Sequence, residues 1–289
     1  MTAAAPAPPA FGTSRPEASR MIADRAADAL LKELDAWRKP GLVSRIDSGS
    51  HNDMDADLLA TSAETLRSFF VEFAAAGQHD APMEELRELG LRVEAAMLAA
   101  RGGVNMHRGA IFGLGLLCAA AGYMQSAIVP SRVAEVLRRR WGHAIMRGPS
   151  PLFSHGAAAL RQHGAGGARA EAAAGFCSVH EIGLPALQRD RLLRPDDRDA
   201  AAVQACFALI ATVQDTNLLH RGGAEGQQIA AAMAEAFLGR GGVGMMDWRE
   251  RAAAAHAAFV ALGLSPGGCA DLLAMTLFVD SISRPGERQ

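Results

Sequence analysis

Residues that favour β-strands are scarce in this chain, and this scarcity constrains its fold more than any other feature. The 289 residues include 13 valines, 9 isoleucines and one tyrosine, and aromatic residues make up only 5% of the total. Alanine-rich runs recur along the chain, and alanine has the highest helix propensity of all residues. No stretch of useful length alternates apolar and polar residues. The composition therefore predicts an all-α protein whose helices pack closely through small side chains.

Apolar residues recur at helical spacing in segments separated by glycine pairs and prolines, which end helices. We expect residues 1–20 to form a flexible tail and residues 21–283 to form one compact all-helical domain. A long loop or broken helix is predicted at 147–167, and a break at 183–185. Helices are predicted over 18–37, 84–101, 107–122, 131–141, 168–175, 197–219, 224–238, 247–262 and 268–281, with a further helix after 37 that begins at an Asp53 cap.

Charge and hydropathy exclude several classes of protein. The chain has 29 basic and 31 acidic residues and a formal net charge of −2, unlike a general nucleic-acid binder. Its most apolar run, 110–121, is too short to span a bilayer, and the first residues lack a signal-peptide pattern. Four cysteines far apart in sequence predict buried thiols rather than disulfides or a zinc site. We expect a cytoplasmic protein that binds neither nucleic acid nor a membrane.

Six short polar patterns lie at predicted helix ends, next to glycines. Glycine lets a backbone approach a ligand closely, and helix N-termini offer free N–H groups to anions. Packing between buried helices does not need such clusters, so they indicate a binding site. The patterns are K-P-G-L-V at 39–43, H-N-D-M-D at 51–55, G-G-V-N-M-H-R-G at 102–109, G-A-R-A-E at 167–171, D-T-N-L-L-H-R-G-G at 215–223 and S-P-G-G-C-A-D at 265–271.

In this order, the six patterns resemble those of the triphosphoribosyl-dephospho-coenzyme A synthases, across roughly residues 25 to 281. The resemblance implies an enzyme that transfers the triphosphoribosyl group of ATP to the ribose 2′-hydroxyl of 3′-dephospho-coenzyme A and releases adenine. Such pentosyl transfer yields a prosthetic-group precursor, which would pass to a carrier-protein transferase. The member that serves malonate decarboxylase is favoured over the one that serves citrate lyase.

The chain departs from the family patterns at a few positions. Met106 replaces the usual threonine between Asn105 and His107, which removes a hydroxyl that could contact phosphate or metal. Cys269 stands where serine is common. The residues at 37–38 and 44–45 also differ from the small residues and the aspartate that the family usually has there. We expect these changes to alter affinity more than the class of reaction.

The resemblance implies a site for ATP and Mg²⁺. Magnesium takes oxygen ligands, so Asp53, Asp55, Asp215 and Asp271 are predicted to converge around one ion. Guanidinium groups bind phosphate with two hydrogen bonds, although an arginine outside such motifs is usually a surface charge. The predicted ATP and phosphate contacts are Lys39, Asn105, Arg108, Arg169, His220, Arg221, Gly222, Gly223, Gly267 and Gly268.

The implied reaction converts a β N-glycosidic bond into an α linkage, so a single displacement through an oxocarbenium-like transition state is expected. Asp215 or Asp53 is the predicted general base for the acceptor hydroxyl, and His107 is the third predicted catalytic residue. Two other classes stay open: a metal-dependent helical hydrolase of nucleotide or ribosyl substrates, and a helical scaffold or coenzyme A-binding subunit without catalysis. A homodimer is also open.

Overall fold

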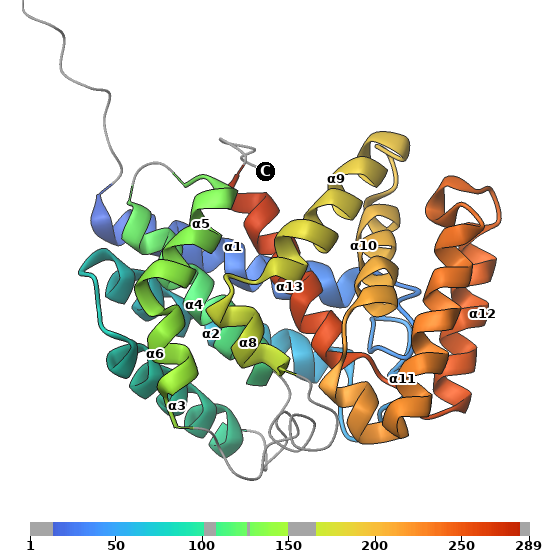
Figure 1. The fold of residues 1–289 in the computed structure, drawn as a ribbon, viewed down its shortest axis with the longest axis horizontal. Helices are drawn as coiled ribbons and strands as arrows, with labels where there is room; N and C mark the ends of the chain where they lie inside the picture. The colour runs from blue at the N-terminus through green and yellow to red at the C-terminus, as the bar shows by residue number, and fades with distance from the viewer. Residues whose placement is uncertain (1–13, 101–107, 126–127, 150–165, 284–289) are drawn as a thin grey trace, which may run out of the picture.

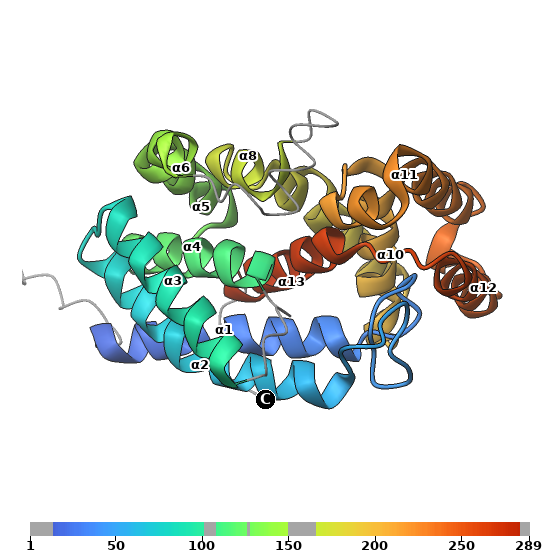
Figure 2. The same cartoon turned by 90° about the horizontal axis from the view of Figure 1, so that it is seen from below.

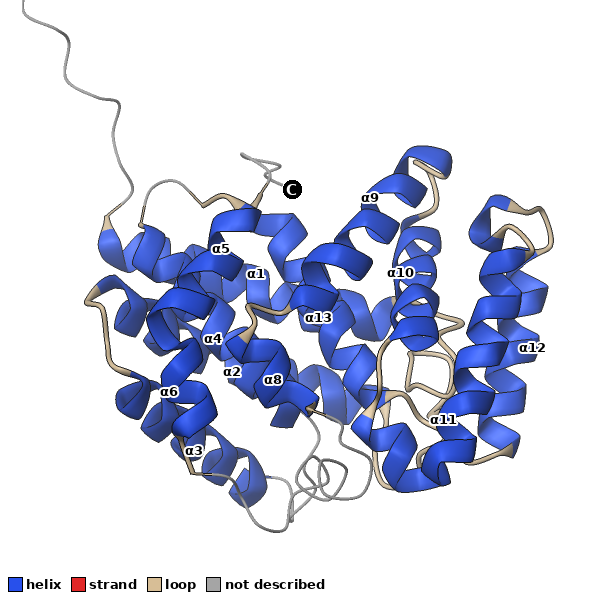
Figure 3. Cartoon of the chain, viewed as in Figure 1, coloured by secondary structure: helices blue, strands red, loops and turns tan. Residues whose placement is uncertain are grey.

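The chain is described by a computed structural model that covers all residues except 1–13, 101–107, 126–127, 150–165 and 284–289. All regular elements in the described ranges are helical, with no strand among them, which confirms the all-α prediction (Figure 3). The elements, labelled in Figure 1, are α1 (Arg15–Asp35), α2 (Ala56–Gln78), α3 (Met83–Ala100), α4 (Arg108–Met124), α5 (Pro130–Val136), the π-helix η1 (Leu137–Trp141), α6 (Gly142–Arg147), α8 (Gly167–Ala173), the π-helix η2 (Val179–Gly183), α9 (Leu184–Leu193), α10 (Arg198–Thr212), α11 (Thr216–Gly239), the 3-10 helix η3 (Gly242–Gly244), α12 (Trp248–Ala261) and α13 (Gly267–Ile282).

Helix α13 runs through the middle of the molecule (Figure 2). It packs against α1 on one side and against α4, α9 and α10 on others. Apolar side chains project from nearly all of its faces, including Leu272, Leu273, Phe278 and Val279, all buried. A helix that is apolar all round is stable only when other helices surround it. The N-terminus of α13 is therefore fixed deep in the fold, and the functional site is built around it.

Helices α2 and α4 approach each other through glycine and alanine, as the composition predicts. A Cβ atom at Gly77 would overlap with the backbone of Ala119, and one at Gly122 would overlap with the backbone of Ala74. Because interiors are packed close to crystal density, no space exists there for a further methyl group. The two contacts hold α4, and with it the start of that helix, at a fixed distance from α2.

This packing predicts opposite effects for two glycine-to-alanine changes within helices. Gly77→Ala should lower the free energy of unfolding by about 1–3 kcal/mol, because the new methyl group forces the helices apart. Gly90→Ala in α3 should raise it by up to about 1 kcal/mol, because nothing lies within 4 Å of the new Cβ and alanine favours the helix. Urea unfolding of both variants and the original chain measures the effects. Equal midpoints for the two variants would refute this account of the packing.

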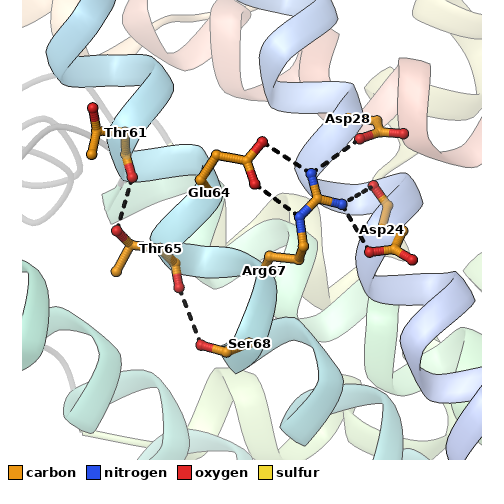
Figure 4. A network of polar contacts seen from close by, with 7 residues as sticks. All are labelled: Asp24, Asp28, Thr61, Glu64, Thr65, Arg67 and Ser68. Carbon is orange, nitrogen blue, oxygen red and sulfur yellow. Dashed lines mark hydrogen bonds and ion pairs between the residues drawn. The ribbon is translucent and has the colours of Figure 1, made fainter.

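A cluster of charges joins the outer faces of α1 and α2 (Figure 4). The Arg67 guanidinium donates to Asp24 at 2.8 Å and Asp28 at 3.2 Å on α1, and to Glu64 at 3.0 Å on its own helix. These hydrogen bonds, that with Glu64 foremost, raise the pKa of Arg67. The carboxylates are exposed, so the cluster adds little to stability and mainly fixes how the two helices lie together.

The predicted helix over 197–219 is in fact two helices. Helix α10 ends at Thr212, the chain turns, and α11 begins after Asp215, which caps it. The predicted stop at 222–223 is instead a kink within α11, because Gly223 has φ 63° and ψ −161° and the helix resumes beyond it. Apolar periodicity runs through the turn, since residues on both sides of it are buried, and this hid the break from sequence analysis.

Three further boundaries differ from the predictions. Helix α1 begins at Arg15, inside the range predicted as tail, where the Ser14 N–H donates to Glu17 at 2.9 Å. The predicted break at 183–185 is wrong, because η2 continues directly into α9 through residues with helical backbone angles, and Pro185 lies at the start of α9. Of the predicted loop at 147–167, residue 147 ends α6, residue 167 begins α8, and 150–165 lie outside the described residues.

The four cysteines can be compared with the predicted buried thiols. Cys118, Cys206 and Cys269 are buried and unpaired, and Cys177 is unpaired but exposed. This confirms the prediction of free thiols, with one exception to their burial.

In the part of the chain that the structure describes, no helix combines the length and apolar character needed to cross a bilayer.

Candidate active site at three helix N-termini

The Asp215 carboxylate lies where the N-termini of α11 and α13 meet. One oxygen accepts hydrogen bonds from the backbone N–H groups of Asn217 at 2.7 Å and Leu218 at 3.3 Å, at the start of α11. The other accepts from the N–H of Cys269 at 2.7 Å, at the start of α13. Asp215 is only 1% exposed. A single side chain thus caps two helices that are far apart in sequence, and its negative charge faces the positive ends of both.

The Asp271 carboxylate joins a third helix to this point. It lies just after the first turn of α13 and projects toward the start of α4, where the N–H of Ala110 donates to it. A Cβ at Gly109 would overlap with one of its oxygens, so only glycine allows this approach. Burial raises the pKa of Asp271 well above its usual range, and the carboxylates of Asp215 and Glu33 raise it further. Burial also raises the pKa of Asp215, against the effect of its hydrogen bonds.

The glycine pair at the start of α13 lets that helix approach α11. A Cβ at Gly267 would lie 2.8 Å from Nδ2 of Asn217, and one at Gly268 would lie 3.1 Å from Asp215. Both distances are shorter than a comfortable van der Waals contact. Gly222 is close to Leu264 in the same way, and Gly223 provides the kink. The glycines predicted to contact ATP therefore have a role in bringing the helix ends together, and their contact with phosphate stays a prediction.

Gln227 holds the turn that carries Asp215, and sequence analysis missed it. Its side-chain oxygen accepts from the N–H of Asp215 at 3.0 Å, and its Nε2 donates to the carbonyl of Val213 at 3.0 Å. The residue lies beyond the Gly223 kink, outside the recognised pattern. No local signal marks it, because the contact depends on how α11 folds back toward its own start.

Lys39 is not exposed to solvent. Its side chain is fully buried, and its ammonium group pairs with the carboxylate and the backbone carbonyl of Glu33, with the Val43 carbonyl at 3.4 Å. Glu33 is in turn one of the charges that raise the pKa of Asp271. Lys39 therefore balances the charge of Glu33, and a direct contact with phosphate stays a prediction. Sequence analysis missed Glu33, because a lone glutamate in a helix resembles a surface residue.

Arg221 connects the start of α11 to two loops. Its Nη1 donates to the carbonyls of Ser50 at 3.0 Å and Gly263 at 3.2 Å, and its Nη2 lies 3.2 Å from Nδ1 of His51. Nε2 of the same imidazole lies 2.8 Å from Oγ of Ser265, just before α13. Burial, and secondly the Arg221 charge, lower the pKa of His51. The imidazole is therefore neutral near pH 7.

The first two predicted metal ligands, Asp53 and Asp55, do not join Asp215 and Asp271 through any contact in the described residues. Asp55 caps α2 by accepting from the N–H of Leu58 at 2.8 Å, so the helix cap predicted at Asp53 belongs two residues later. The Asp53 side chain is 62% exposed, and its Oδ1 lies 3.6 Å from Nδ1 of His51. Asp215 and Asp271 are neighbours, but the described residues contain no group of three or more His, Cys, Asp or Glu arranged to hold a metal. The magnesium site stays a prediction.

The remaining predicted contacts lie at different places. Nη2 of Arg169 is 2.6 Å from the carbonyl of Ile145 and 2.8 Å from that of Met146, at the end of α6. Arg108 begins α4, next to the Gly109 that lies against Asp271; its side chain is 41% exposed, and its Nε lies 3.4 Å from Glu94. His220 is exposed, next to Arg221. Asn105 and His107 lie outside the described residues.

Comparison with known proteins identifies the family. The model of the ATP:dephospho-CoA triphosphoribosyl transferase family matches residues 19–289. A probable 2-(5''-triphosphoribosyl)-3'-dephosphocoenzyme-A synthase of Stutzerimonas stutzeri is 40% identical over 277 residues, which are 93% of each chain. Proteins of the same name from Azotobacter vinelandii and Acinetobacter calcoaceticus are 38% and 36% identical, over 93% and 88% of each chain. No solved structure matches. The chain therefore belongs to the ATP:dephospho-CoA triphosphoribosyl transferase family.

Proposed function

We propose that this chain transfers the triphosphoribosyl group of ATP to the 2′-hydroxyl of 3′-dephospho-coenzyme A and releases adenine. The names of its relatives support this reaction. The observation that carries the proposal is the meeting of three helix N-termini, those of α4, α11 and α13, around Asp215 and Asp271. Paired carboxylates attract the cation that accompanies ATP, and the exposed Arg221 in the first turns of α11 offers N–H groups to phosphate. The same place therefore suits both parts of a magnesium nucleotide.

Asp271 and Asp215 fit a magnesium ion by their chemistry. Mg²⁺ is usually held by one or two carboxylates, with substrate phosphates and water as its other ligands. Burial raises the pKa of both groups, so a bound cation would favour their charged forms. Asp271 is the stronger candidate ligand, because both oxygens of Asp215 already accept backbone N–H groups. When bound, the ion would neutralise part of the triphosphate charge.

The chain's own side chains then divide the work of transfer. Arg221 and Arg108 bind the triphosphate, since Arg221 is exposed in the first turns of α11 and the Arg108 side chain is partly exposed at the start of α4, next to Gly109 and Asp271. Asp53 takes the proton of the acceptor hydroxyl, because its carboxylate is accessible whereas that of Asp215 is enclosed. Asp215 keeps α11 and α13 in register. Holding donor and acceptor in line in this way supplies much of the rate enhancement.

The test is incubation of the purified chain with ATP, Mg²⁺ and 3′-dephospho-coenzyme A, followed by mass analysis. We expect adenine release that requires the acceptor, together with a product heavier by the triphosphoribosyl group. Release of adenine or phosphate without acceptor would indicate a hydrolase instead. Binding of both substrates with no turnover would indicate a non-catalytic coenzyme A-binding protein.

The finer part of the proposal is that the product serves the acyl carrier protein of malonate decarboxylase, after a carrier-protein transferase attaches it. The overall character of the six motifs supports this choice over citrate lyase. We expect genes for malonate decarboxylase subunits to neighbour this one in the genome. Citrate lyase genes in their place would contradict this part while leaving the proposed reaction intact.

Replacement of Arg108 by alanine tests the triphosphate contact at the start of α4. Loss of one charge-assisted hydrogen bond costs about 1.5–3 kcal/mol, so transfer should fall about tenfold to hundredfold. Lysine at this position should restore only part of the rate, because it lacks the planar fork of donors. Arg92→Ala is the matched control, since Arg92 is 60% exposed on α3 and pairs with Glu72 at 2.6 Å. Equal rates for both alanine variants would remove Arg108 from the site.

A further inference from the structure

The contacts of His51 determine which of its ring nitrogens carries the proton. Two groups face Nδ1: Nη2 of Arg221 at 3.2 Å, and the Asp53 carboxylate, whose Oδ1 is farther away at 3.6 Å. Arg221 can only donate, so in the closer contact Nδ1 is the acceptor. The proton of the neutral ring is then on Nε2, which donates to Oγ of Ser265 at 2.8 Å. The side chain is only 13% exposed. The imidazole is therefore held at both nitrogens, in one tautomer and one orientation.

This ring links three segments that the sequence separates widely. His51 precedes α2, Arg221 lies in the first turns of α11, and Ser265 precedes α13. The Arg221 contacts with the described residues engage three of the five N–H groups that a guanidinium carries. Arg221 itself is exposed, so its other N–H groups can reach a ligand. Its orientation depends on its acceptors among the described residues. These are two backbone carbonyls and the ring of His51, so His51 is the one side chain among them.

We propose that His51 is a positioning residue: it holds the Arg221 guanidinium in the orientation that binds the triphosphate and ties it to the N-terminus of α13 through Ser265. His51 itself does not contact the substrate. The proposal rests on the proposed function for the identity of the anion. Because a flexible arginine must be ordered before it can bind phosphate with two hydrogen bonds, an acceptor that orders it in advance increases affinity.

Two substitutions separate this role from mere support of the fold. Asparagine places a side-chain oxygen near the position of Nδ1, so His51→Asn keeps an acceptor for Arg221 and loses the contact with Ser265. Glutamine places its amide near the position of Nε2, so His51→Gln keeps a donor for Ser265 and loses the acceptor for Arg221. If His51 positions Arg221, the asparagine variant should bind anions better than the glutamine variant. A structural role alone gives no reason for that order.

The experiment measures the affinity for inorganic tripolyphosphate by calorimetry and the KM for ATP in the transfer assay. His51→Gln should weaken tripolyphosphate binding and raise the KM by about tenfold, with a smaller change in kcat. His51→Asn should stay within about threefold of the original chain. The double variant of His51→Gln with Arg221→Ala should bind no more weakly than Arg221→Ala alone, because the two residues act together. His79→Gln is the control, since His79 is exposed at the end of α2 and pairs with Glu85 at 2.9 Å.

Either of two results would overturn the inference: equal losses in the two His51 variants, or additive losses for His51→Gln and Arg221→Ala. Thermal unfolding of each variant shows whether it is folded, and the asparagine variant keeps the test valid should the glutamine variant be unstable. The tripolyphosphate titration needs no turnover. A chain that binds tripolyphosphate in a His51-dependent way but makes no product would refute the proposed function and leave the positioning role intact.

Discussion

Replacement of Asp215 by alanine is expected to cause the largest loss of both stability and transfer. It leaves three backbone N–H groups, those of Asn217, Leu218 and Cys269, buried without an acceptor. The free energy of unfolding should fall by about 3 kcal/mol or more, since each such group costs about 1 kcal/mol or more. Removal of a buried charge offsets part of this loss. Transfer should fall about 100-fold or more, because the starts of α11 and α13 lose the side chain that joins them. A small displacement of side chains is costly in a catalytic site.

The matched control is Asp197→Ala. Asp197 also caps a helix, α10, where its carboxylate accepts from the N–H of Ala200 at 3.3 Å, and it pairs with Arg249 on α12 rather than with the start of α13. Its loss should cost about 1 kcal/mol of stability and leave transfer unchanged. Urea unfolding and the mass assay of the product measure the two effects. A variant at position 215 that behaved like the one at 197 would show that Asp215 is an ordinary cap.

Replacement of Asp271 by asparagine is expected to stabilise the protein and to inactivate it. The raised pKa of this carboxyl group means that the folded chain disfavours its charge. Asparagine removes the charge and keeps an oxygen to accept from the N–H of Ala110. Transfer should nevertheless fall by about 100-fold or more, because a neutral amide is a poor magnesium ligand and even outer contacts of a metal site are worth about 10–100-fold. Such opposition of stability and activity is common at functional sites.

The pH dependence of this stabilisation follows from the direction of the pKa shift. In the unfolded chain the carboxyl group of Asp271 ionises near pH 4. Because its folded pKa is higher, the penalty is absent below that pH, grows as the pH rises toward the folded pKa, and is fully present above it. The gain from asparagine should therefore be largest near neutral pH and shrink toward about pH 4. Unfolding midpoints of both proteins across this range measure it, and a constant or reversed difference would contradict the assignment.

Much of the fold could be predicted because it depends on local chemistry. The helical class follows from the scarcity of Val, Ile and Tyr and from the alanine-rich runs. Helices α3, α12 and α13 have nearly the predicted boundaries, since glycine, proline and capping residues act within a few positions of themselves. The boundary at Asp215 was hidden by the apolar residues on both sides of it, although its capping contacts with Asn217 and Leu218 are local. Its second role, as an acceptor for the N–H of Cys269 on α13, depends on the tertiary structure and could not be predicted in this way.

The candidate site shows the same division between what patterns predict and what contacts decide. The motifs selected Asp215 and Asp271, which contact the starts of α4, α11 and α13, and Arg221, which contacts the loops before α2 and α13. They also selected Lys39, which is buried against Glu33, and Arg169, which contacts the end of α6. Glu33 and Gln227 carry no pattern, and only their contacts reveal them. A motif marks a residue type at a spacing and does not tell a ligand contact from a contact within the protein.

The sequence by itself therefore determined the helical class, the family and the order of the motifs, because composition and short-range spacing are properties of the chain alone. Only the tertiary structure decided which carboxylates are neighbours, which glycines are needed, and which cations are buried. Gly109 and Asp271 illustrate the reason: 162 positions separate them, yet the start of α4 leaves no room for a Cβ beside that carboxylate. Their contact results from the packing of α13 against α4 in the middle of the fold. Burial there, which sequence spacing does not reveal, raises the pKa of Asp271.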